Sequence, residues 1–231
     1  HGRFASTKAH SEADLIIAAG VRFSDRATGN RSKYTQNAKV IHIDIDPAEI
    51  NKNIETHCSL VGDVGTVVTK LLDKVEKKTN TQWMDAVQKM KDLKEMRSCK
   101  DSVMHPEDII EKVMEYTDAS TIVATDVGQH QMWVAQYYRF KKPRTHLTSG
   151  GLGAMGFGMG AAIGGCVASG GKRTVLFTGD GSFGMNLIEL ATAVTYKLPL
   201  VILIFNNGVL GMVRQWQHAF FDSRYSHTTL D

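Results

Sequence analysis

The sequence predicts an α/β protein built on parallel β-sheets, and three observations carry that prediction. Short runs of β-branched and other apolar residues recur along the 231 residues, and most of them end in Asp, Gly or Asn. Stretches compatible with helices separate these runs, a pattern typical of parallel sheets covered on both faces. The composition agrees, because 42% hydrophobic and 22% charged residues describe an ordinary globular protein of one or two domains.

Three strands are predicted in the first half, at residues 15–20, 40–44 and 59–63. The third is followed by residues 67–72, whose apolar positions recur at helical spacing. This repeated strand–helix order predicts a first domain over residues 1–73.

The next stretch loses the strand pattern and is charged and rich in methionine. Its apolar residues recur at helical spacing, which predicts a helix that docks one face on a neighbour: Trp83, Val87, Met90 and Leu93. His105 and Pro106 then mark a new helix start, because proline is favoured in the first helical turn. We therefore predict a helical linker over residues 74–104 and a second domain over residues 105–231.

The second domain repeats the strand–helix order, with strands predicted at residues 121–126, 174–180 and 200–206. Between the last two strands lie a helical segment at residues 186–196 and a break at residues 197–199. Together they form one βαβ unit, which brings the carboxyl ends of both strands to the same edge of the sheet.

Charge and composition argue against several function classes. The formal net charge is only +3 and basic residues alternate with acidic ones, so no basic stripe for nucleic acid is present. No apolar run approaches the ~18 residues that span a bilayer. Cys58, Cys99 and Cys166 show neither a disulfide nor a CxxC spacing, which favours a reducing cytoplasm. Because the chain starts at His1 and not at a methionine, we expect it to be a fragment of a longer protein.

Glycine is concentrated in one stretch, since 13 of the 21 glycines fall between Gly150 and Gly184. Such a cluster indicates tight turns or a backbone that approaches a ligand closely. Residues 151–156 match G-x-G-x-x-G, and Asp180 follows at about the spacing of the acidic residue in a dinucleotide-binding site. However, the preceding residues 144–148 are a weak strand and Asp180 belongs to a second glycine turn. A nicotinamide site is therefore the minor alternative.

The second glycine turn is paired with an asparagine turn. Asp180 ends one strand of the βαβ unit, and residues 206–207, both asparagine, end the other. A carboxylate and a carboxamide oxygen therefore converge at the carboxyl edge of the sheet, where α/β proteins bind ligands. Both are hard oxygen ligands suited to Mg²⁺, and the neighbouring glycines and Ser182 leave backbone N–H groups for phosphate oxygens. The pattern predicts a magnesium–diphosphate site.

The residues around this site resemble those of acetolactate synthase (acetohydroxyacid synthase), a family of thiamin diphosphate-dependent enzymes. Beyond the GDGS turn and the Asn-Asn pair, residues 126–133, 148–156 and 206–217 are similar to the large catalytic subunit of this family. Residues 20–30 resemble its flavin-binding loop, and the likeness is weakest over residues 74–102. The resemblance implies a thiamin diphosphate-binding domain preceded by the C-terminal part of a Rossmann-like central domain.

The resemblance implies roles for individual residues. Asp180 and Asn207 would bind Mg²⁺ through their side chains and Val209 through its backbone carbonyl, so the side chain at that last position is free to vary. His130 would lie beside the phosphates, oriented by packing, and would not act as a general base. Met155 would hold the cofactor in its bent shape. The residues that would surround thiamin diphosphate are Gly128, Gln129, His130, Gly153, Met155, Gly179, Gly181, Ser182, Gly211 and Met212.

The resemblance also implies contacts with a second substrate and with FAD, which is structural in this family. Trp216 would line the second-substrate pocket, where a Trp accompanies a preference for 2-oxobutyrate over a second pyruvate. Ser24 stands where the family often has Asp, which weakens one expected FAD contact. The residues that would contact FAD are Arg22, Arg26, Asp44, Ile45 and Asp63.

The implied reaction joins pyruvate, after loss of CO₂, to a second 2-oxoacid. Its products are 2-acetolactate or 2-aceto-2-hydroxybutyrate, in the first common step of branched-chain amino acid biosynthesis. The subunits would form a homodimer or tetramer to which a small regulatory subunit could bind. The glutamate that activates the cofactor lies in an N-terminal domain of the family, and no residue here matches it. We therefore predict no catalytic residue in this chain and no sustained turnover by it alone.

Three alternatives remain open. Another thiamin diphosphate-dependent decarboxylase, oxidase or carboligase would share the glycine and asparagine turns, although the flavin loop and residues 215–217 argue against it. A nicotinamide-dependent dehydrogenase would use the glycine motif at residues 151–156. A non-catalytic binding module would keep the fold without needing the Asp180–Asn207 pair.

Overall fold

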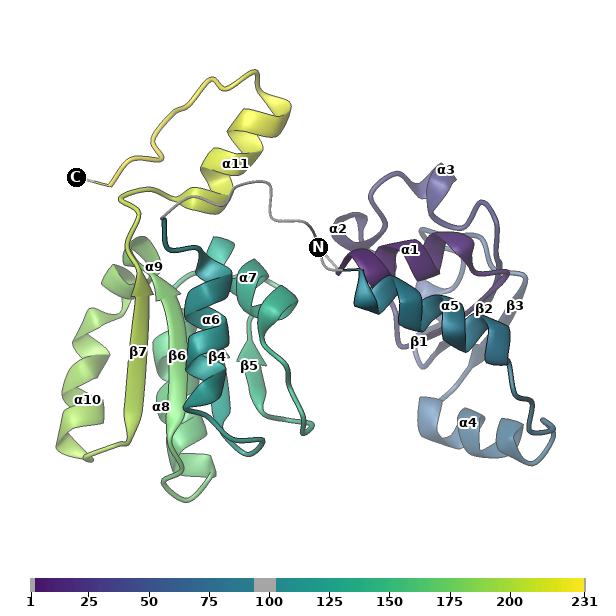
Figure 1. Cartoon of the computed structure of the whole chain (residues 1–231), viewed down its shortest axis with the longest axis horizontal. Coiled ribbons are helices and arrows are strands. Elements are labelled where there is room, and N and C mark those ends of the chain that lie inside the picture. Colours follow the sequence, from purple (N-terminus) through teal and green to yellow (C-terminus); the bar gives the residue numbers. More distant parts are fainter. Residues whose placement is uncertain (1–2, 94–102, 231) are drawn as a thin grey trace. The chain divides into compact units, whose positions relative to one another are not determined.

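The computed structural model describes residues 3–93 and 103–230 of the chain. The chain forms two compact units, His1–Lys100 and Asp101–Asp231 (Figure 1). Each unit has one β-sheet covered by helices, and all strand pairs of both sheets are parallel. The predicted fold class, α/β with parallel sheets, is therefore confirmed.

The first unit holds a three-stranded sheet in the order β1-β2-β3. Its strands lie close to the predicted runs: β1 (Leu15–Ala19), β2 (Lys39–Asp44) and β3 (Cys58–Val61). The helices are α1 (Phe4–Glu12), α2 (Asp25–Thr28), α3 (Arg31–Tyr34), η1 (Pro47–Glu49), α4 (Val64–Leu72) and α5 (Thr81–Asp92). A small core of Ala18, Phe23, Val40 and Ile54 holds β1 and β2 to the segments that follow them.

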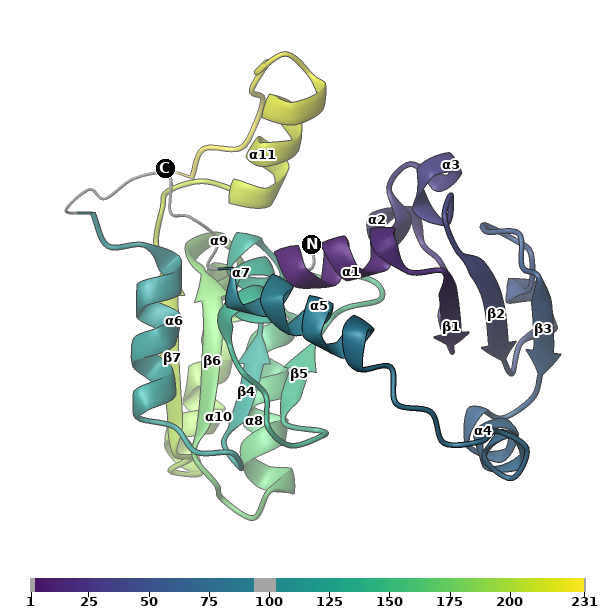
Figure 2. The ribbon, with the colours of Figure 1, turned by 45° about the vertical axis from the view of Figure 1, so that its right-hand side comes forward.

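Helix α5 falls in the segment for which a helical linker is predicted. It packs beside α1 within the first unit, as both views of the ribbon show (Figure 2). Met90 is buried there, whereas Trp83 and Leu93 stay exposed. The rest of that prediction, over residues 94–102 and including Cys99, lies outside the described residues.

The second unit holds a four-stranded sheet in the order β5-β4-β6-β7. Its strands are β4 (Ile122–Thr125), β5 (His146–Thr148), β6 (Thr174–Gly179) and β7 (Leu200–Phe205). The helices are α6 (Pro106–Glu115), α7 (Gln129–Tyr137), α8 (Phe157–Ala168), α9 (Asp180–Met185), η2 (Leu187–Glu189), α10 (Leu190–Thr195) and α11 (Gly211–Phe220). The predicted helix at residues 186–196 is thus divided into η2 and α10. Strand β5 occurs in the stretch whose strand pattern is weak in the sequence.

The second unit is a three-layer sandwich, because alternate residues of each strand point to opposite faces of the sheet. Val123, Val175 and Phe177 pack on the face that α6 and α7 cover. Ala124 and Leu176 pack on the opposite face, against α8 (Figure 1). The interior strands β4 and β6 are therefore apolar on both faces, as their continuous apolar runs predict.

Helix α8 approaches the end of β4 closely at Gly158. A Cβ atom at this position would lie 2.8 Å from the Cβ atom of Asp126 and 2.9 Å from its backbone nitrogen. A Cβ atom at Gly160, two residues further along the helix and exposed, would meet nothing within 4 Å. The packing distance between α8 and β4 thus depends on the absence of a side chain at residue 158.

Within residues 3–93 and 103–230, no helix combines the length and the apolar character needed to cross a membrane. Cys58 is an exposed free thiol on β3, and Cys166 is a buried free thiol on α8.

Two glycine substitutions in α8 should have opposite effects on stability. Gly158→Ala should lower the free energy of unfolding of the second unit by about 1–3 kcal/mol, because backbone atoms of β4 would have to shift. Gly160→Ala should raise it by about 0.5–1 kcal/mol, because alanine is the better helix former in open space. Urea unfolding followed by circular dichroism measures both values. Equal effects of the two substitutions would contradict the close approach.

Candidate functional site

The site residues predicted in the second unit all follow the carboxyl ends of its strands. They are Gly128, Gln129 and His130 after β4; Gly153 and Met155 after β5; Gly179, Asp180, Gly181 and Ser182 at the end of β6; and Asn207, Val209, Gly211, Met212 and Trp216 after β7. Because parallel strands end at a common edge, four separate segments of the chain meet there.

Asp180 and Asn207 follow neighbouring strands and are held by backbone N–H groups. One carboxylate oxygen of Asp180 accepts a hydrogen bond from the N–H of Gly208 at 2.7 Å, and the other accepts from the N–H of Gly181 at 3.0 Å. The side-chain oxygen of Asn207 accepts from the N–H of Val209 at 3.1 Å. The carboxylate of Asp180 therefore lies directly beside the turn that carries Asn207.

This donor set is compatible with a cation that prefers oxygen ligands. Each of these side-chain oxygens can accept a further interaction, because a carboxylate or carboxamide oxygen has two lone pairs. In the part of the chain that the structure describes, no group of three His, Cys, Asp or Glu side chains could hold a metal. A cation beside Asp180 would thus depend on amide and backbone oxygens, and on oxygens of a bound ligand, as Mg²⁺ commonly does.

Three glycines at this edge lie too close to neighbouring side chains to carry a side chain of their own. A Cβ atom at Gly211 would collide with the side-chain oxygen of Gln129, and one at Gly128 would lie 2.6 Å from the His130 ring. A Cβ atom at Gly181 would lie 2.9 Å from the side chain of Leu210. The starts of α7, α9 and α11 therefore approach neighbouring side chains more closely than any residue other than glycine would allow.

Two side-chain hydrogen bonds join these converging segments. The hydroxyl of Ser182, at the start of α9, donates to the backbone carbonyl of Val127 at 2.9 Å. The side-chain amide of Gln129, at the start of α7, donates to the side-chain oxygen of Gln215 on α11 at 3.1 Å. Both bonds hold loops of different strands at a fixed separation.

His130 is buried beneath this edge and is neutral at pH 7. Its ring lies against Gly128 and Gly179, and its Nε2 atom has no hydrogen-bond partner among the described residues. Burial lowers the pKa of His130 to about 4, and the nearby carboxylates of Asp126 and Asp180 only partly oppose this shift. The ring is thus neutral and held in place by packing, and its role beside the phosphates stays a prediction.

Trp216 lies on α11, whose first turn carries Gly211 and Met212. Its ring packs on Phe220, with 5.3 Å between the ring centroids, and about two fifths of the residue remains exposed. The chain after α11 turns back, so that the N–H of Leu210 donates to the carbonyl of Thr228 at 2.7 Å. This return segment holds the turn before α11 in place.

The residues predicted to contact FAD follow the strands of the first unit. Arg22 and Arg26 come after β1, Asp44 and Ile45 lie at the end of β2, and Asp63 comes after β3. Ile45 is largely exposed, as are both arginines. The three-stranded sheet thus brings these five residues to its carboxyl edge.

The two acids of this group already have partners. One oxygen of the buried Asp44 accepts from the N–H of Asp46 at 2.9 Å, and the other lies 3.6 Å from Nε2 of His42. Asp63 begins α4 and accepts from the N–H of Thr66 at 2.8 Å, which holds the pKa of Asp63 below its usual value. Asp63 is thus chiefly the cap of a helix.

Sequence reasoning does not single out Asp126 and Asn186, although both connect segments of the site. The buried carboxylate of Asp126 accepts from the N–H groups of Gly156 at 2.9 Å and Gly158 at 2.8 Å. The side chain of Asn186 donates to the carbonyl of Gly156 at 2.5 Å. The available signal for Asp126 is its position directly after a buried strand, which it shares with Asp180.

The G-x-G-x-x-G match at residues 151–156 lies between β5 and α8, in the strand–turn–helix order that a dinucleotide site needs. However, β5 has only three residues and forms the edge of the sheet. The backbone N–H and carbonyl of Gly156 are already hydrogen-bonded to the side chains of Asp126 and Asn186. Gly156 therefore serves the internal packing of the unit.

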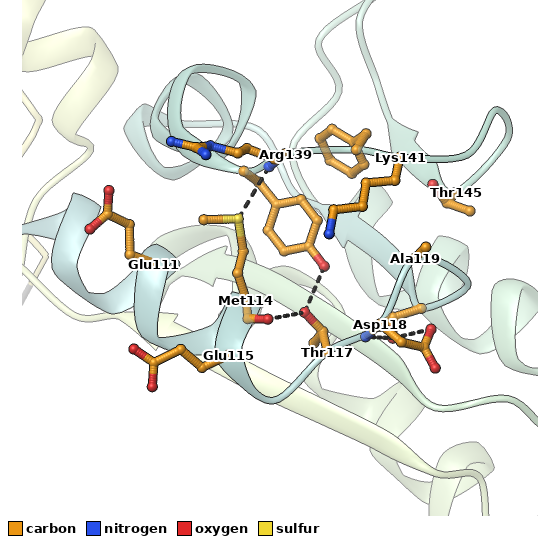
Figure 3. A pocket seen from close by; sticks show the side chains of 12 residues that line it. Glu111, Met114, Glu115, Thr117, Asp118, Ala119, Arg139, Lys141 and Thr145 are labelled. Carbon is orange, nitrogen blue, oxygen red and sulfur yellow. Dashed lines mark hydrogen bonds between the residues drawn. The ribbon is translucent and has the colours of Figure 1, made fainter. Parts of the chain in front are cut away.

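A pocket of about 400 Å³ lies at the opposite, amino edge of the same sheet (Figure 3). It is lined by the end of α6 and by residues that precede β4 and β5, among them Glu111, Met114, Asp118, Arg139 and Lys141. None of the predicted site residues lines it.

Acid should destabilise the ligand-free chain through His130. Since its pKa is about 4 when folded and near 6.5 when unfolded, proton binding favours the unfolded chain as the pH falls through this interval. The free energy of unfolding is therefore highest above pH 6.5 and falls by up to about 3 kcal/mol as the pH decreases toward 4. Urea unfolding in the presence of a chelator should show a smaller loss for His130→Gln, and an unchanged loss for the exposed His227→Gln. Equal losses in the two variants would contradict the burial effect.

Comparison with known proteins agrees with this architecture. Residues 1–71 match the family described as thiamine pyrophosphate enzyme, central domain, and residues 126–231 match the family described as thiamine pyrophosphate enzyme, C-terminal TPP binding domain. The chain is 40% identical to the acetolactate synthase large subunit of Buchnera aphidicola over 236 residues, which cover 100% of this chain and 41% of that protein. It is 43% identical to the probable acetolactate synthase large subunit of Methanocaldococcus jannaschii, with coverage of 100% and 41%. It is also 43% identical to the chloroplastic acetolactate synthase 2 of Nicotiana tabacum, with coverage of 100% and 36%.

The chain thus spans about two fifths of the length of these relatives, and the similarity extends over its whole length. Each matched domain lies within one of the two units, and both units have the parallel sheets described above. The chain therefore belongs to the thiamine pyrophosphate enzymes, as a homologue of acetolactate synthase large subunits that carries their central and C-terminal domains.

Proposed function

We propose that this chain supplies the cofactor-binding part of an enzyme that depends on thiamin diphosphate (thiamine pyrophosphate) and Mg²⁺. The reaction joins pyruvate, after loss of CO₂, to a second 2-oxoacid and gives 2-acetolactate or 2-aceto-2-hydroxybutyrate. The observation that carries this proposal is the carboxylate of Asp180, which lies 2.7 Å from the backbone nitrogen that follows Asn207. This juxtaposition occurs at the ligand-binding edge of a domain whose relatives are named acetolactate synthase.

Asp180, Asn207 and the backbone carbonyl of Val209 would hold Mg²⁺ between the protein and the diphosphate. The backbone N–H groups around Gly128 and Gly211, at the starts of α7 and α11, would face the phosphate oxygens. When bound, thiamin diphosphate supplies the nucleophilic carbon and accepts the charge that loss of CO₂ leaves. The buried neutral ring of His130 would support the loops beneath the phosphates without adding a charge there.

We further propose that Trp216 contributes to the second-substrate pocket and favours 2-oxobutyrate. The residue lies one helical turn after Met212 on α11, and Gln215 beside it is tied to α7 by the bond from Gln129. Its position is thereby coupled to the start of α7. An indole with two fifths of its surface exposed offers an apolar wall to a 2-oxoacid with one extra methylene group.

We propose that the first unit binds FAD, with a structural role, at the carboxyl edge of its sheet. The arginines after β1 supply positive charge for a diphosphate. Asp44 ends β2, the strand beside β1, and Asp63 follows β3. Both acids are engaged in local hydrogen bonds, so their contribution to FAD binding would be mainly to shape the loops.

We also propose that the enzyme assembles as a homodimer or tetramer in the cytoplasm and binds a small regulatory subunit. Large apolar side chains exposed along η2, α10 and the edge strand β7 support burial of these residues in an assembly: Ile188, Val194, Val201 and Ile204. The exposed free thiol of Cys58 supports a reducing compartment. The relatives are named large subunits, which supports a smaller partner.

Asp180→Ala should abolish Mg²⁺-dependent binding of thiamin diphosphate, because it removes the only charged ligand of the proposed cation site. Isothermal titration calorimetry of the chain with thiamin diphosphate, with and without Mg²⁺, measures this. Asp118→Ala, which removes an exposed acid at the opposite edge of the sheet, is the matched control and should bind as the parent does. Unchanged binding by Asp180→Ala would refute the metal assignment. Binding of NADH in place of thiamin diphosphate would favour the dehydrogenase alternative.

Arg22→Ala should weaken FAD binding by about two- to fivefold, the effect of losing one exposed ion pair with a phosphate. Quenching of flavin fluorescence on titration of FAD with the chain measures the affinity. Arg31→Ala, a substitution of another exposed arginine in the same unit, should leave the affinity unchanged. Equal affinities of the parent chain and Arg22→Ala would exclude the proposed contact.

A further inference from the structure

We infer that Asp126 is a positioning residue for the thiamin diphosphate site. Its carboxylate joins the loop that carries Gly153 and Met155 to the strand end that carries residues 128–130, and so sets the separation between two walls of the site. The inference rests on the proposed function for the identity of the ligand, whereas the anchoring itself is a property of the ligand-free fold.

The carboxylate of Asp126 is satisfied entirely by backbone N–H groups of its surroundings. One oxygen accepts from Val127 at 2.7 Å and from Gly156 at 2.9 Å, and the other accepts from Gly158 at 2.8 Å. The residue is only 2% exposed. Because a buried charge is strongly disfavoured without partners, these three groups must stay where they are.

Two of the three partners of Asp126, Gly156 and Gly158, lie at the start of α8, just after Met155. Gly156 has φ of +88°, a conformation that side chains rarely allow, and it is the residue that precedes the first turn of α8. N–H groups in the first turn of a helix lack partners within the helix, and a carboxylate is well suited to bind them. The charge of Asp126 therefore fixes where the loop ends and where Met155, the residue before Gly156, is placed.

A second contact extends the anchor to the Asp180 segment. The side chain of Asn186 donates to the carbonyl of Gly156 at 2.5 Å, so Gly156 is held on both sides of its backbone. Asn186 directly follows α9, the helix that begins at Asp180. The hydroxyl of Ser182 in that helix binds the carbonyl of Val127, next to Asp126. Through these bonds, the segments after β4, β5 and β6 are held in one buried polar network.

The first test measures the anchor without any ligand. Amide hydrogen exchange of Gly156 and Gly158, followed by NMR, should accelerate at least about tenfold in Asp126→Ala, because the acceptor is lost. The assigned methyl signal of Met155 should shift in the same variant. Asp118→Ala is the matched control, since Asp118 also accepts backbone and hydroxyl groups (Ser120 N–H at 2.6 Å and Ser120 hydroxyl at 2.8 Å) but lies at the other edge of the sheet. It should change neither observable.

The second test measures the consequence for the cofactor by calorimetry with thiamin diphosphate and Mg²⁺. Asp126→Ala should raise the Kd at least about tenfold, whereas Asp118→Ala should leave it unchanged. Asp126→Asn should restore part of the affinity, because its remaining oxygen can still accept from Val127 and Gly156 while its NH₂ group faces the N–H of Gly158. If Asp126 only stabilised the fold, its variants that still unfold cooperatively would bind thiamin diphosphate equally well. Their Kd values would then not follow this graded order.

The outcomes separate this inference from the proposed function. If the parent chain binds thiamin diphosphate and folded Asp126→Ala binds it equally well, Asp126 has no positioning role. Should Asp126→Ala fail to fold, Asp126→Asn decides by the same criterion, with parental affinity overturning the inference. If the parent chain itself binds no thiamin diphosphate, the proposed function fails, and the exchange data on Gly156 and Gly158 alone decide whether the anchor exists.

Discussion

The arrangement of the second unit depends on a single buried carboxylate. Asp126, at the end of an interior strand, accepts three backbone N–H groups, two of which belong to the start of α8. Removal of a buried charge from water is costly unless it is fully hydrogen-bonded, so the strand end and the helix start cannot separate without losing this compensation. Gly158 is the steric counterpart of the same constraint, since any side chain there would meet Asp126.

This constraint explains how a flat sheet edge becomes a defined site. Parallel strands deliver four loops to one edge, but topology alone does not determine the distances between them. Those distances are set by a few bonds between loops: Asp126 to Gly156, Asn186 to Gly156, Ser182 to Val127, Gln129 to Gln215 and Asp180 to Gly208. The same bonds bring the starts of α7, α9 and α11 together at this edge.

The sequence predicts the βαβ unit from residue 174 to residue 206 well, because its two strands are long, apolar and bounded by turns. It places Asp180 and Asn207 at one edge for the same reason, and the structure shows a carboxylate oxygen of Asp180 bonded to the residue after Asn207. Strand β5 cannot be predicted in this way, because three half-buried residues show no clear hydrophobic period. It is a strand because it pairs with β4 at the edge of the sheet.

The sequence by itself determined the fold class, the order of the longer strands and the chemical identity of the residues at the strand ends, because hydrophobic period and turn residues are local properties. Only the tertiary structure decided that Asp126 and Asn186 hold the loops, and that His130 is buried and neutral. These properties arise from contacts between residues distant in the chain, such as Asp126 with Gly158 and Asn186 with Gly156. A pattern along the sequence records which residues are present, whereas burial and hydrogen-bond partners depend on where the rest of the chain lies.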